Sequence, residues 1–257
     1  MKYILYTFFS VITLTTTAQN NAAKTPKSPK QNPHLAMFNV ALTSGDIISA
    51  TAALNYYISE QGDNNVFTDT LAMMYLQQGM YNQAYYWSDK RLKVKPDDTN
   101  LLEIYGACLD KLQQPKEAID VFEKLFKKTQ NPYHGYKLLE LQYNIKRLNE
   151  SLETAFATEK LVFKPEYTIT YSFGEQVGRT YLQAGVYNIH ALALFSLDKK
   201  QEAKAYFEKA IALDTTFALA KQNLQTLLTL EQQVPPVNET VPVNNSPAIL
   251  NNSNKQK

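Results

Sequence analysis

Residues 203–214 read AKAYFEKAIALD, and the spacing of their small and aromatic residues recurs along the chain. Ala203 is followed four positions later by Phe207, and Ala210 closes the motif. The same arrangement, a small residue or its substitute followed four positions later by a larger one, recurs every 34 residues at Ala50/Leu54, Ala84/Ser88, Ala118/Phe122 and Leu152/Phe156. A fixed period of this length is typical of helical repeat arrays, which present extended surfaces to partners.

The period divides the chain into units at 31–64, 65–98, 99–132, 133–166 and, after an interruption, 184–217. The second unit carries Leu71, Ala72 and Tyr75, then Gly79, Ala84 and a closing Pro96. This order resembles the tetratricopeptide repeat, whose pattern is W-x2-L-G-x2-Y, then A-x3-F, then P. The resemblance implies an all-α fold, a right-handed α-solenoid of helix-turn-helix repeats over 34–231.

Helix packing gives the pattern its physical reason. Small residues at Ala72, Gly106 and Ala191 let each first helix approach the second, and Phe122, Phe156 and Phe207 fill the space towards the next unit. Glu140 stands at the glycine place of the fourth unit, so we expect less regular packing there. Gly45 and Gly79 suit sharp inter-helix turns that require positive φ. Residues 218–231 (ALAKQNLQTLLTLE) predict a capping helix with Leu224 and Leu227 turned inwards.

The period is broken at 167–183, which reads YTITYSFGEQVGRTYLQ. Aromatic and β-branched residues alternate with Thr168, Thr170 and Ser172, and this period of two favours a strand. We predict a small β-hairpin before the fifth unit. The alternative is a loop followed by an early helix start at Gln176. An insertion in a regular array is a place where individual function concentrates.

Charge and cysteine content exclude several function classes. The net charge is +2, but residues 1–33 contribute +4 and residues 232–257 contribute +1, so the segment 34–231 carries −3. A mildly acidic repeat array argues against nucleic-acid binding, which needs a basic face. The single cysteine, Cys108, excludes an intramolecular disulfide and is expected to be a buried structural thiol.

The N-terminal segment predicts export, and the composition of both chain ends predicts disorder. Lys2 precedes an apolar stretch from Tyr3 to Leu14, and small residues end at Ala18, as in a signal peptide spanning 1–18. We therefore expect an exported protein, periplasmic or secreted, with no stable membrane span after cleavage; the alternative is an uncleaved N-terminal anchor. Residues 19–33 and 232–257 are polar and proline-containing, and their composition predicts a disordered linker and a disordered tail.

No catalytic motif is present in the sequence. The metalloprotease, hydrolase, P-loop and dinucleotide-binding patterns are all missing, and the three histidines are far apart along the chain. His190 is expected to be packed and hydrogen-bonded. We expect no enzyme activity, no cofactor and no metal site.

The first helices of such repeats line a concave groove, where apolar residues would contact a protein or peptide partner. The expected contacts are Met73, Leu76, Leu141, Leu192 and Phe195 in the groove, with Tyr171 and Phe173 in the insert. Coverage of these side chains by neighbouring helices is the alternative. The sequence thus predicts a non-catalytic interaction scaffold or adaptor of the bacterial cell envelope. A carbohydrate-binding envelope component and an accessory subunit of an enzyme complex remain open.

Overall fold

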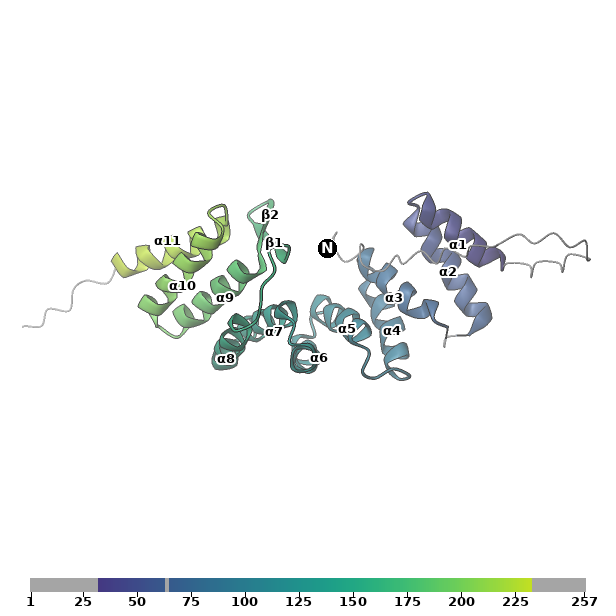
Figure 1. Cartoon of the computed structure of the whole chain (residues 1–257), viewed down its shortest axis with the longest axis horizontal. Helices are drawn as coiled ribbons and strands as arrows, with labels where there is room; N and C mark the ends of the chain where they lie inside the picture. Colours follow the sequence, from purple (N-terminus) through teal and green to yellow (C-terminus); the bar gives the residue numbers. More distant parts are fainter. Residues whose placement is uncertain (1–31, 63–64, 233–257) are drawn as a thin grey trace, which may run out of the picture.

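The structure, a computed structural model, describes residues 32–62 and 65–232 (Figure 1). The helices are α1 (Pro33–Thr43), α2 (Ile47–Gln61), α3 (Phe67–Gln77), α4 (Tyr81–Leu92), α5 (Thr99–Lys111), α6 (Pro115–Thr129), α7 (Pro132–Asn144), α8 (Leu148–Glu159), α9 (Leu182–Ser196), α10 (Lys200–Leu213) and α11 (Ala218–Gln232). The strands β1 (Thr168–Phe173) and β2 (Gln176–Tyr181) lie between α8 and α9.

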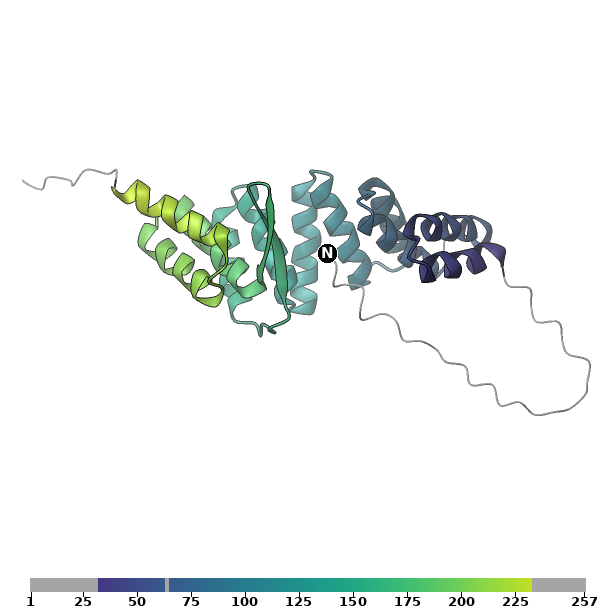
Figure 2. The ribbon, with the colours of Figure 1, turned by 90° about the horizontal axis from the view of Figure 1, so that it is seen from above.

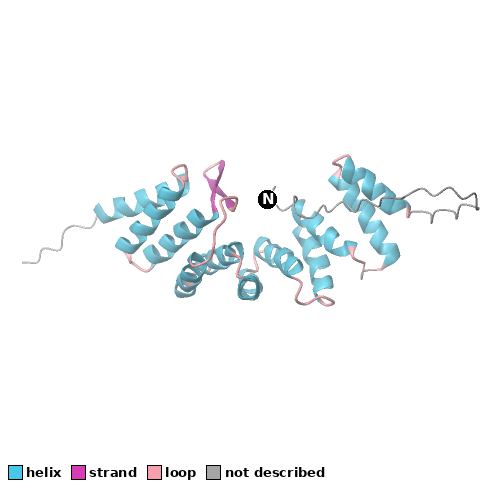
Figure 3. Ribbon diagram, viewed as in Figure 1, coloured by secondary structure: helices cyan, strands magenta, loops and turns pink. Residues whose placement is uncertain are grey.

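The helices form antiparallel pairs that stack side by side into an open arc. Each second helix packs on the first helix of the following unit, so the hydrophobic core continues along the array. In Figure 1 the second helices α6 and α8 lie on the convex side, and the hairpin projects into the concave side. Figure 3 shows that helix dominates throughout the described ranges. The prediction of an all-α solenoid is confirmed.

The turns within the helix pairs show where the repeat period slips. One residue in each turn has positive φ: Gly45 (76°), Gly79 (73°), Gln113 (60°), Lys146 (66°) and Asp198 (59°). The predicted positive φ at the two glycines is confirmed. The spacing between these residues is 34, 34, 33 and 52, so the step into the fourth unit is one residue short. The helix-capping residues Asp98 and Asn131 are also 33 apart, which places the slip before α7.

This slip corrects the expected pairing of Leu152 with Phe156. Counted from the turn, Ser151 takes the small-residue position, and its hydroxyl donates to the carbonyl of Leu139 on the facing helix at 2.9 Å. The position four residues later, which holds Phe122 in the third unit, is taken by Ala155, which is fully buried. Phe156 is 47% exposed. Glu140 accordingly does not stand at the glycine place; Leu139 does, and it is fully buried.

The interruption forms an antiparallel β-hairpin, as predicted, and the alternative of a loop with an early helix is wrong. Ile169 lies so close to Gly185 of α9 that a Cβ added to this glycine would overlap the isoleucine side chain. Ile169 also belongs to a hydrophobic cluster with Tyr136. Tyr171 packs on Phe217 at 4.7 Å between ring centroids. The backbone N–H of Ala218, the first residue of α11, donates to the Tyr171 hydroxyl at 3.1 Å. The hairpin therefore ties α9 to α11.

The last helix covers the C-terminal end of the array. Ala220 and Leu227 of α11 are fully buried, while Lys221, Gln222 and Gln225 are exposed. This division of apolar and polar residues agrees with the predicted capping role. The expected signal peptide at 1–18 lies outside the described residues. So do the expected linker at 19–33 and tail at 232–257, apart from residues 32–33 and 232.

Cys108 is fully buried in α5, as predicted. Burial raises the pKa of its thiol to about 12, so the nucleophilic thiolate is scarce at neutral pH. In the folded protein at pH 8, we expect a thiol reagent such as Ellman's reagent to react at least about a hundredfold more slowly than in denaturant. Equal rates in both conditions would contradict the burial of this side chain.

Candidate partner-binding surface

Three positions of each first helix share the face that the repeat register assigns to the inner side of the arc. They lie ten, six and three residues before the positive-φ turn residue, so the same face of each helix recurs from unit to unit. After the first unit these residues are Asp69, Met73 and Leu76; Glu103, Ala107 and Asp110; Tyr136, Glu140 and Tyr143; and Asn188, Leu192 and Phe195. All are half-buried except Tyr136 and Asn188, which are buried.

Four of the five predicted groove contacts, Met73, Leu76, Leu192 and Phe195, occupy these register positions. Met73 and Leu76 are half-buried beside the core of the first units, and Leu192 and Phe195 are half-buried beside the core of the last. Leu141 is only 2% exposed, so it is not available to a partner. The one-residue slip explains the difference, because Leu141 takes the buried position of Cys108 and Glu140 takes the inner position.

The middle of the inner face holds a central acidic cluster, formed by Asp110 and Glu140 beside Lys137 and by Glu103 beside His134. The Lys137 ammonium lies 2.5 Å from a Glu140 carboxylate oxygen and 3.5 Å from one of Asp110. The Glu103 carboxylate lies 3.5 Å from the imidazole of the buried His134. The side chains of the three acids are between 26% and 32% exposed, so the cluster carries accessible negative charge.

Burial and charge together set the protonation of this cluster. Burial opposes the charged form of Lys137, but the carboxylates of Glu140 and Asp110 outweigh it and raise the pKa of the ammonium above its usual range. Burial and the Glu140 carboxylate likewise raise the pKa of Tyr136, whose hydroxyl donates to Glu140 at 3.1 Å. Near neutral pH Lys137 is charged and Tyr136 is a neutral donor, so both stabilise the Glu140 carboxylate.

Asp69 does not add to this negative charge, although it lies at the same inner position. Its carboxylate oxygens lie 2.5 Å from Nε of Arg91, which is 3% exposed, and 3.1 Å from Nζ of Lys95. Because Asp69 balances a buried cation of α4, it belongs to the packing between α3 and α4. At the inner-face positions, the acids that do not balance a buried arginine are therefore those of the central acidic cluster.

The hairpin stands beside this surface. Figure 2, which looks onto the concave side, shows the two strands crossing in front of the neighbouring helices. Tyr171, a predicted partner contact, is half-buried and its ring packs on Phe217 of the last units. Phe173, the other predicted contact, is half-buried at the end of β1 beside the turn. The exposed apolar residues of the hairpin are instead Val177 (76%) and Tyr181 (46%).

His190 of α9 is packed and hydrogen-bonded, as predicted. Its Nδ1 lies 2.5 Å from a carboxylate oxygen of Glu159, and its ring is tilted against Tyr206 at 3.8 Å between centroids. These contacts connect α8, α9 and α10. Because the ring is fully buried, it is not accessible to a ligand. Within residues 32–62 and 65–232, no group of His, Cys, Asp and Glu side chains is arranged to hold a metal ion.

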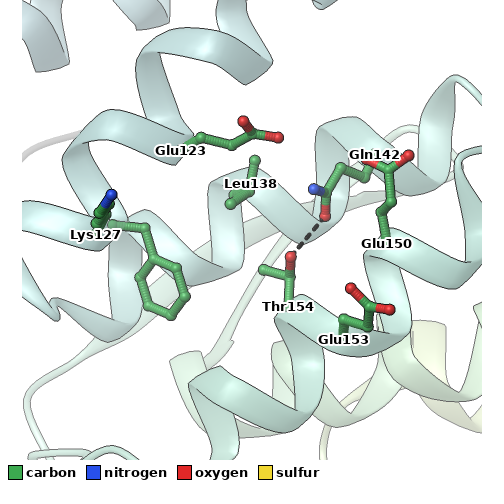
Figure 4. A pocket seen from close by; sticks show the side chains of 8 residues that line it. Glu123, Lys127, Leu138, Gln142, Glu150, Glu153 and Thr154 are labelled. Carbon is green, nitrogen blue, oxygen red and sulfur yellow. Dashed lines mark hydrogen bonds between the residues drawn. The ribbon is translucent and has the colours of Figure 1, made fainter.

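The outer side of the array has a shallow, open pocket of about 280 Å³ between α6 and α8 (Figure 4). Leu138 and Gln142 form its floor, and the Thr154 hydroxyl donates to the Gln142 side-chain oxygen at 2.8 Å. Arg147 pairs with Glu150 and reaches Glu123 at 4.0 Å, so two of the surrounding carboxylates already have a cation. This pocket is a gap between consecutive second helices.

The unbroken period misassigned the inner-face positions of α7 and so missed three residues, Tyr136, Glu140 and Tyr143. A signal for them was present, because the helix-initiating segments Asp98-Thr99 and Asn131-Pro132 are 33 residues apart, one fewer than the period. Caps and prolines mark helix starts more directly than the apolar period does.

None of the helices in the described ranges combines the length and apolarity that crossing a membrane requires.

Two family models match parts of the chain. Residues 184–217 match the model of the tetratricopeptide repeat, and residues 47–125 match that of subunit 3 of the anaphase-promoting complex, or cyclosome. No curated protein matches the chain.

Solved structures share the fold. YrrB, described as a tetratricopeptide-repeat protein with an unusual peptide-binding site, is 16% identical with a TM-score of 0.60, over 75% of this chain and 91% of that one. MamA from Desulfovibrio magneticus RS-1 is 18% identical with a TM-score of 0.58, over 72% and 95%. The pilF protein of Pseudomonas aeruginosa is 20% identical with a TM-score of 0.52, over 64% and 68%. The match at 184–217 identifies a tetratricopeptide repeat there, and the five helix pairs of the described residues give this chain the fold of a tetratricopeptide-repeat array.

Proposed function

We propose that this protein is an exported, non-catalytic scaffold of the bacterial cell envelope that holds a segment of a partner protein on its concave face. The repeat fold supports an interaction scaffold, since such arrays bind protein or peptide partners and are typically non-catalytic. The similarity to YrrB, a peptide-binding protein by its description, agrees with this proposal at the level of the fold.

The distribution of charge along the inner face is the observation that carries the proposal. Half-buried apolar residues, Met73 and Leu76, lie on one side of the central acidic cluster, and Leu192 and Phe195 lie on the other. A matching partner segment has a lysine or arginine near its middle and apolar residues on either side. The exposed Val177 of the hairpin adds a further apolar contact beside the groove.

Capture from native envelope extract by the wild-type protein and matched variants tests this function. We expect the pair Met73→Ala and Leu76→Ala, and separately Asp110→Asn, to reduce capture of the same partner by about tenfold. The change at Asp110 should also weaken the dependence of binding on salt. Two variants outside the inner-face positions serve as controls. Val94→Ala controls for the loss of an apolar side chain, and Asp97→Asn controls for the loss of a negative charge.

Unchanged capture by both groove variants would overturn the groove as the binding site. Point variants are preferable to deletion of 167–183, because Ile169 and Tyr171 of the hairpin are part of the packing. N-terminal sequencing of the protein from an envelope fraction tests export: a chain beginning after residue 18 is expected, and an intact Met1 would contradict cleavage.

The two alternative functions have less support. Carbohydrate binding needs several exposed coplanar aromatic rings, but of Tyr167, Tyr171 and Tyr181 only Tyr181 is exposed, at 46%. An active site assembled from dispersed residues needs an enclosed pocket with convergent charged groups. The pocket between α6 and α8 is shallow and open.

A further inference from the structure

The first unit presents apolar side chains that other units bury. Val40 of α1 is 70% exposed, whereas its repeat equivalents Met74, Cys108, Leu141 and Ala193 are each 5% exposed or less. Met37 is 53% exposed, whereas its equivalents Leu71, Leu138 and His190 are buried and Tyr105 is half-buried. In later units the preceding second helix helps to cover this face. Among the helices of the described residues, none takes the corresponding place beside α1.

The second helix of the first unit adds apolar residues where other units are polar. Ile48 of α2 is 76% exposed, and its equivalents are Asn82, Lys116, Asn149 and Gln201. Tyr56 is 63% exposed, and three of its four equivalents are lysines, Lys90, Lys124 and Lys209, with Ala157 as the fourth. The lack of a preceding second helix does not explain why Ile48 and Tyr56 are exposed, because the equivalent positions in later units also face water. We call Met37, Val40, Ile48 and Tyr56 the N-terminal edge.

Two observations connect this edge into one surface. Ile48 and Tyr56 are eight residues apart, with exposed Ala52 between them, so they lie in one row along α2. The His34 ring of α1 stacks on Tyr56 at 5.5 Å between centroids, and Met37 is one turn further along α1. The opposite end of the array is different, because α11 presents Lys221, Gln222 and Gln225 to water. End-to-end stacking of copies would pair an apolar edge with a polar one.

The charges around the edge are all of one sign apart from histidine. Residues 32–62 contain no lysine or arginine, and their only acids are Asp46 and Glu60. Asp46 caps the start of α2 by accepting the N–H of Ser49 at 3.0 Å, and Glu60 lies near the end of the helix, 3.2 Å from His34. The two carboxylates therefore lie at opposite ends of the apolar row, about 21 Å apart along the helix axis at 1.5 Å per residue.

We propose that the N-terminal edge binds an amphipathic α-helix of a partner protein, with an apolar stripe facing Val40 and Ile48 and basic residues near both ends. The place beside α1 that no described helix takes favours a helix, the apolar row favours a stripe at i, i+4 and i+8, and the flanking carboxylates favour lysine or arginine. This surface is separate from the inner groove, so it brings a second protein to a scaffold whose concave face is occupied.

A synthetic helical peptide tests the proposal directly. The probe has 18 residues, leucines at three successive i, i+4 positions and lysines near both ends; a second peptide has glutamate in place of each lysine. By fluorescence anisotropy with the full chain, we expect the lysine peptide to bind at least about tenfold more tightly than the glutamate peptide. Val40→Asp and Ile48→Asp should each weaken binding by about tenfold or more.

Matched variants distinguish binding at the N-terminal edge from nonspecific adsorption of the peptide. Val162→Asp, at a position that is 82% exposed between α8 and β1, is expected to leave binding unchanged. Asp46→Asn with Glu60→Gln should remove most of the preference for lysine, and the groove variant Asp110→Asn should retain it. Equal binding of both peptides, or binding that Val162→Asp also weakens, would overturn the proposal.

Two further outcomes would identify a different occupant. Self-association that is seen by sedimentation and abolished by Val40→Asp would assign the edge to a second copy of the chain. Binding of the lysine peptide that appears only when residues 19–31 are removed together with 1–18 would assign the edge to the chain's own N-terminal segment. Either result would overturn the partner-helix proposal and leave the proposed function of the groove to its own test.

Discussion

Replacing Phe207 by alanine is expected to lower the free energy of unfolding by about 3–5 kcal/mol. The Phe207 side chain is 0% exposed to solvent and lies in the cluster formed by α9, α10 and α11. Truncation removes most of an aromatic side chain from this core and leaves a cavity that helices fixed by a hairpin cannot close easily. Urea denaturation followed by circular dichroism measures the change.

The matched control for Phe207→Ala is Phe156→Ala. By the simple 34-residue period Phe156 takes an equivalent place, yet it is 47% exposed and touches the His190 ring edge-on at 4.6 Å between centroids. We expect a loss of only about 1 kcal/mol, the typical energy of one aromatic contact. Equal losses for the two variants would contradict the one-residue slip that places Ala155 in the core.

The position of the damage is also predicted. Repeat arrays are stabilised by contacts within units and between neighbours, so a cavity at one end has little effect at the other. For Phe207→Ala we expect amide hydrogen exchange to accelerate mainly in α9, α10 and α11, with little change in α1 to α4. A uniform acceleration along the chain would show that the array unfolds as one cooperative unit.

The fold was predictable from sequence because its main determinants are local. The period, the small residues at Ala84, Ala118 and Ala203, and the alternation after Tyr167 report helix contacts and strand geometry directly. The slip was missed because an apolar period tolerates a one-residue error: Leu152 and Ser151 both end up buried. Only the turn and the cap, which depend on backbone conformation, distinguish the two registers.

The candidate site was less predictable for the same reason. Its predicted apolar residues Met73, Leu76, Leu192 and Phe195 are half-buried and keep the register positions that the period assigned to them. The central acidic cluster combines residues from α5 and α7, on either side of the slip, so an unbroken period assigns Leu141 instead of Glu140. The role of Tyr171 depends on contact with Phe217, 46 residues further along the chain, which no local pattern reports.

Gly135 of α7 provides the second prediction of large effect, because it lies where three helices meet. A Cβ at this position would overlap the Thr158 side chain of α8 and come within 2.9 Å of the Phe126 ring of α6. Alanine is normally better than glycine inside a helix by about 1 kcal/mol. Here we expect Gly135→Ala to destabilise the protein by about 1–3 kcal/mol through overpacking, with urea denaturation as the measurement.

A double-mutant cycle assigns the cost of Gly135→Ala to its cause. Thr158 is fully buried, β-branched, and its hydroxyl donates to the carbonyl of Thr154 at 2.7 Å, so it cannot rotate away from an added methyl group. Thr158→Ala removes both overlapping atoms, and in that background we expect Gly135→Ala to be neutral or stabilising. The coupling energy should be about 1–3 kcal/mol and favourable to the pair. Additive losses would place the cost in the α7 backbone and would contradict a steric limit set by the close approach of α7 to α8.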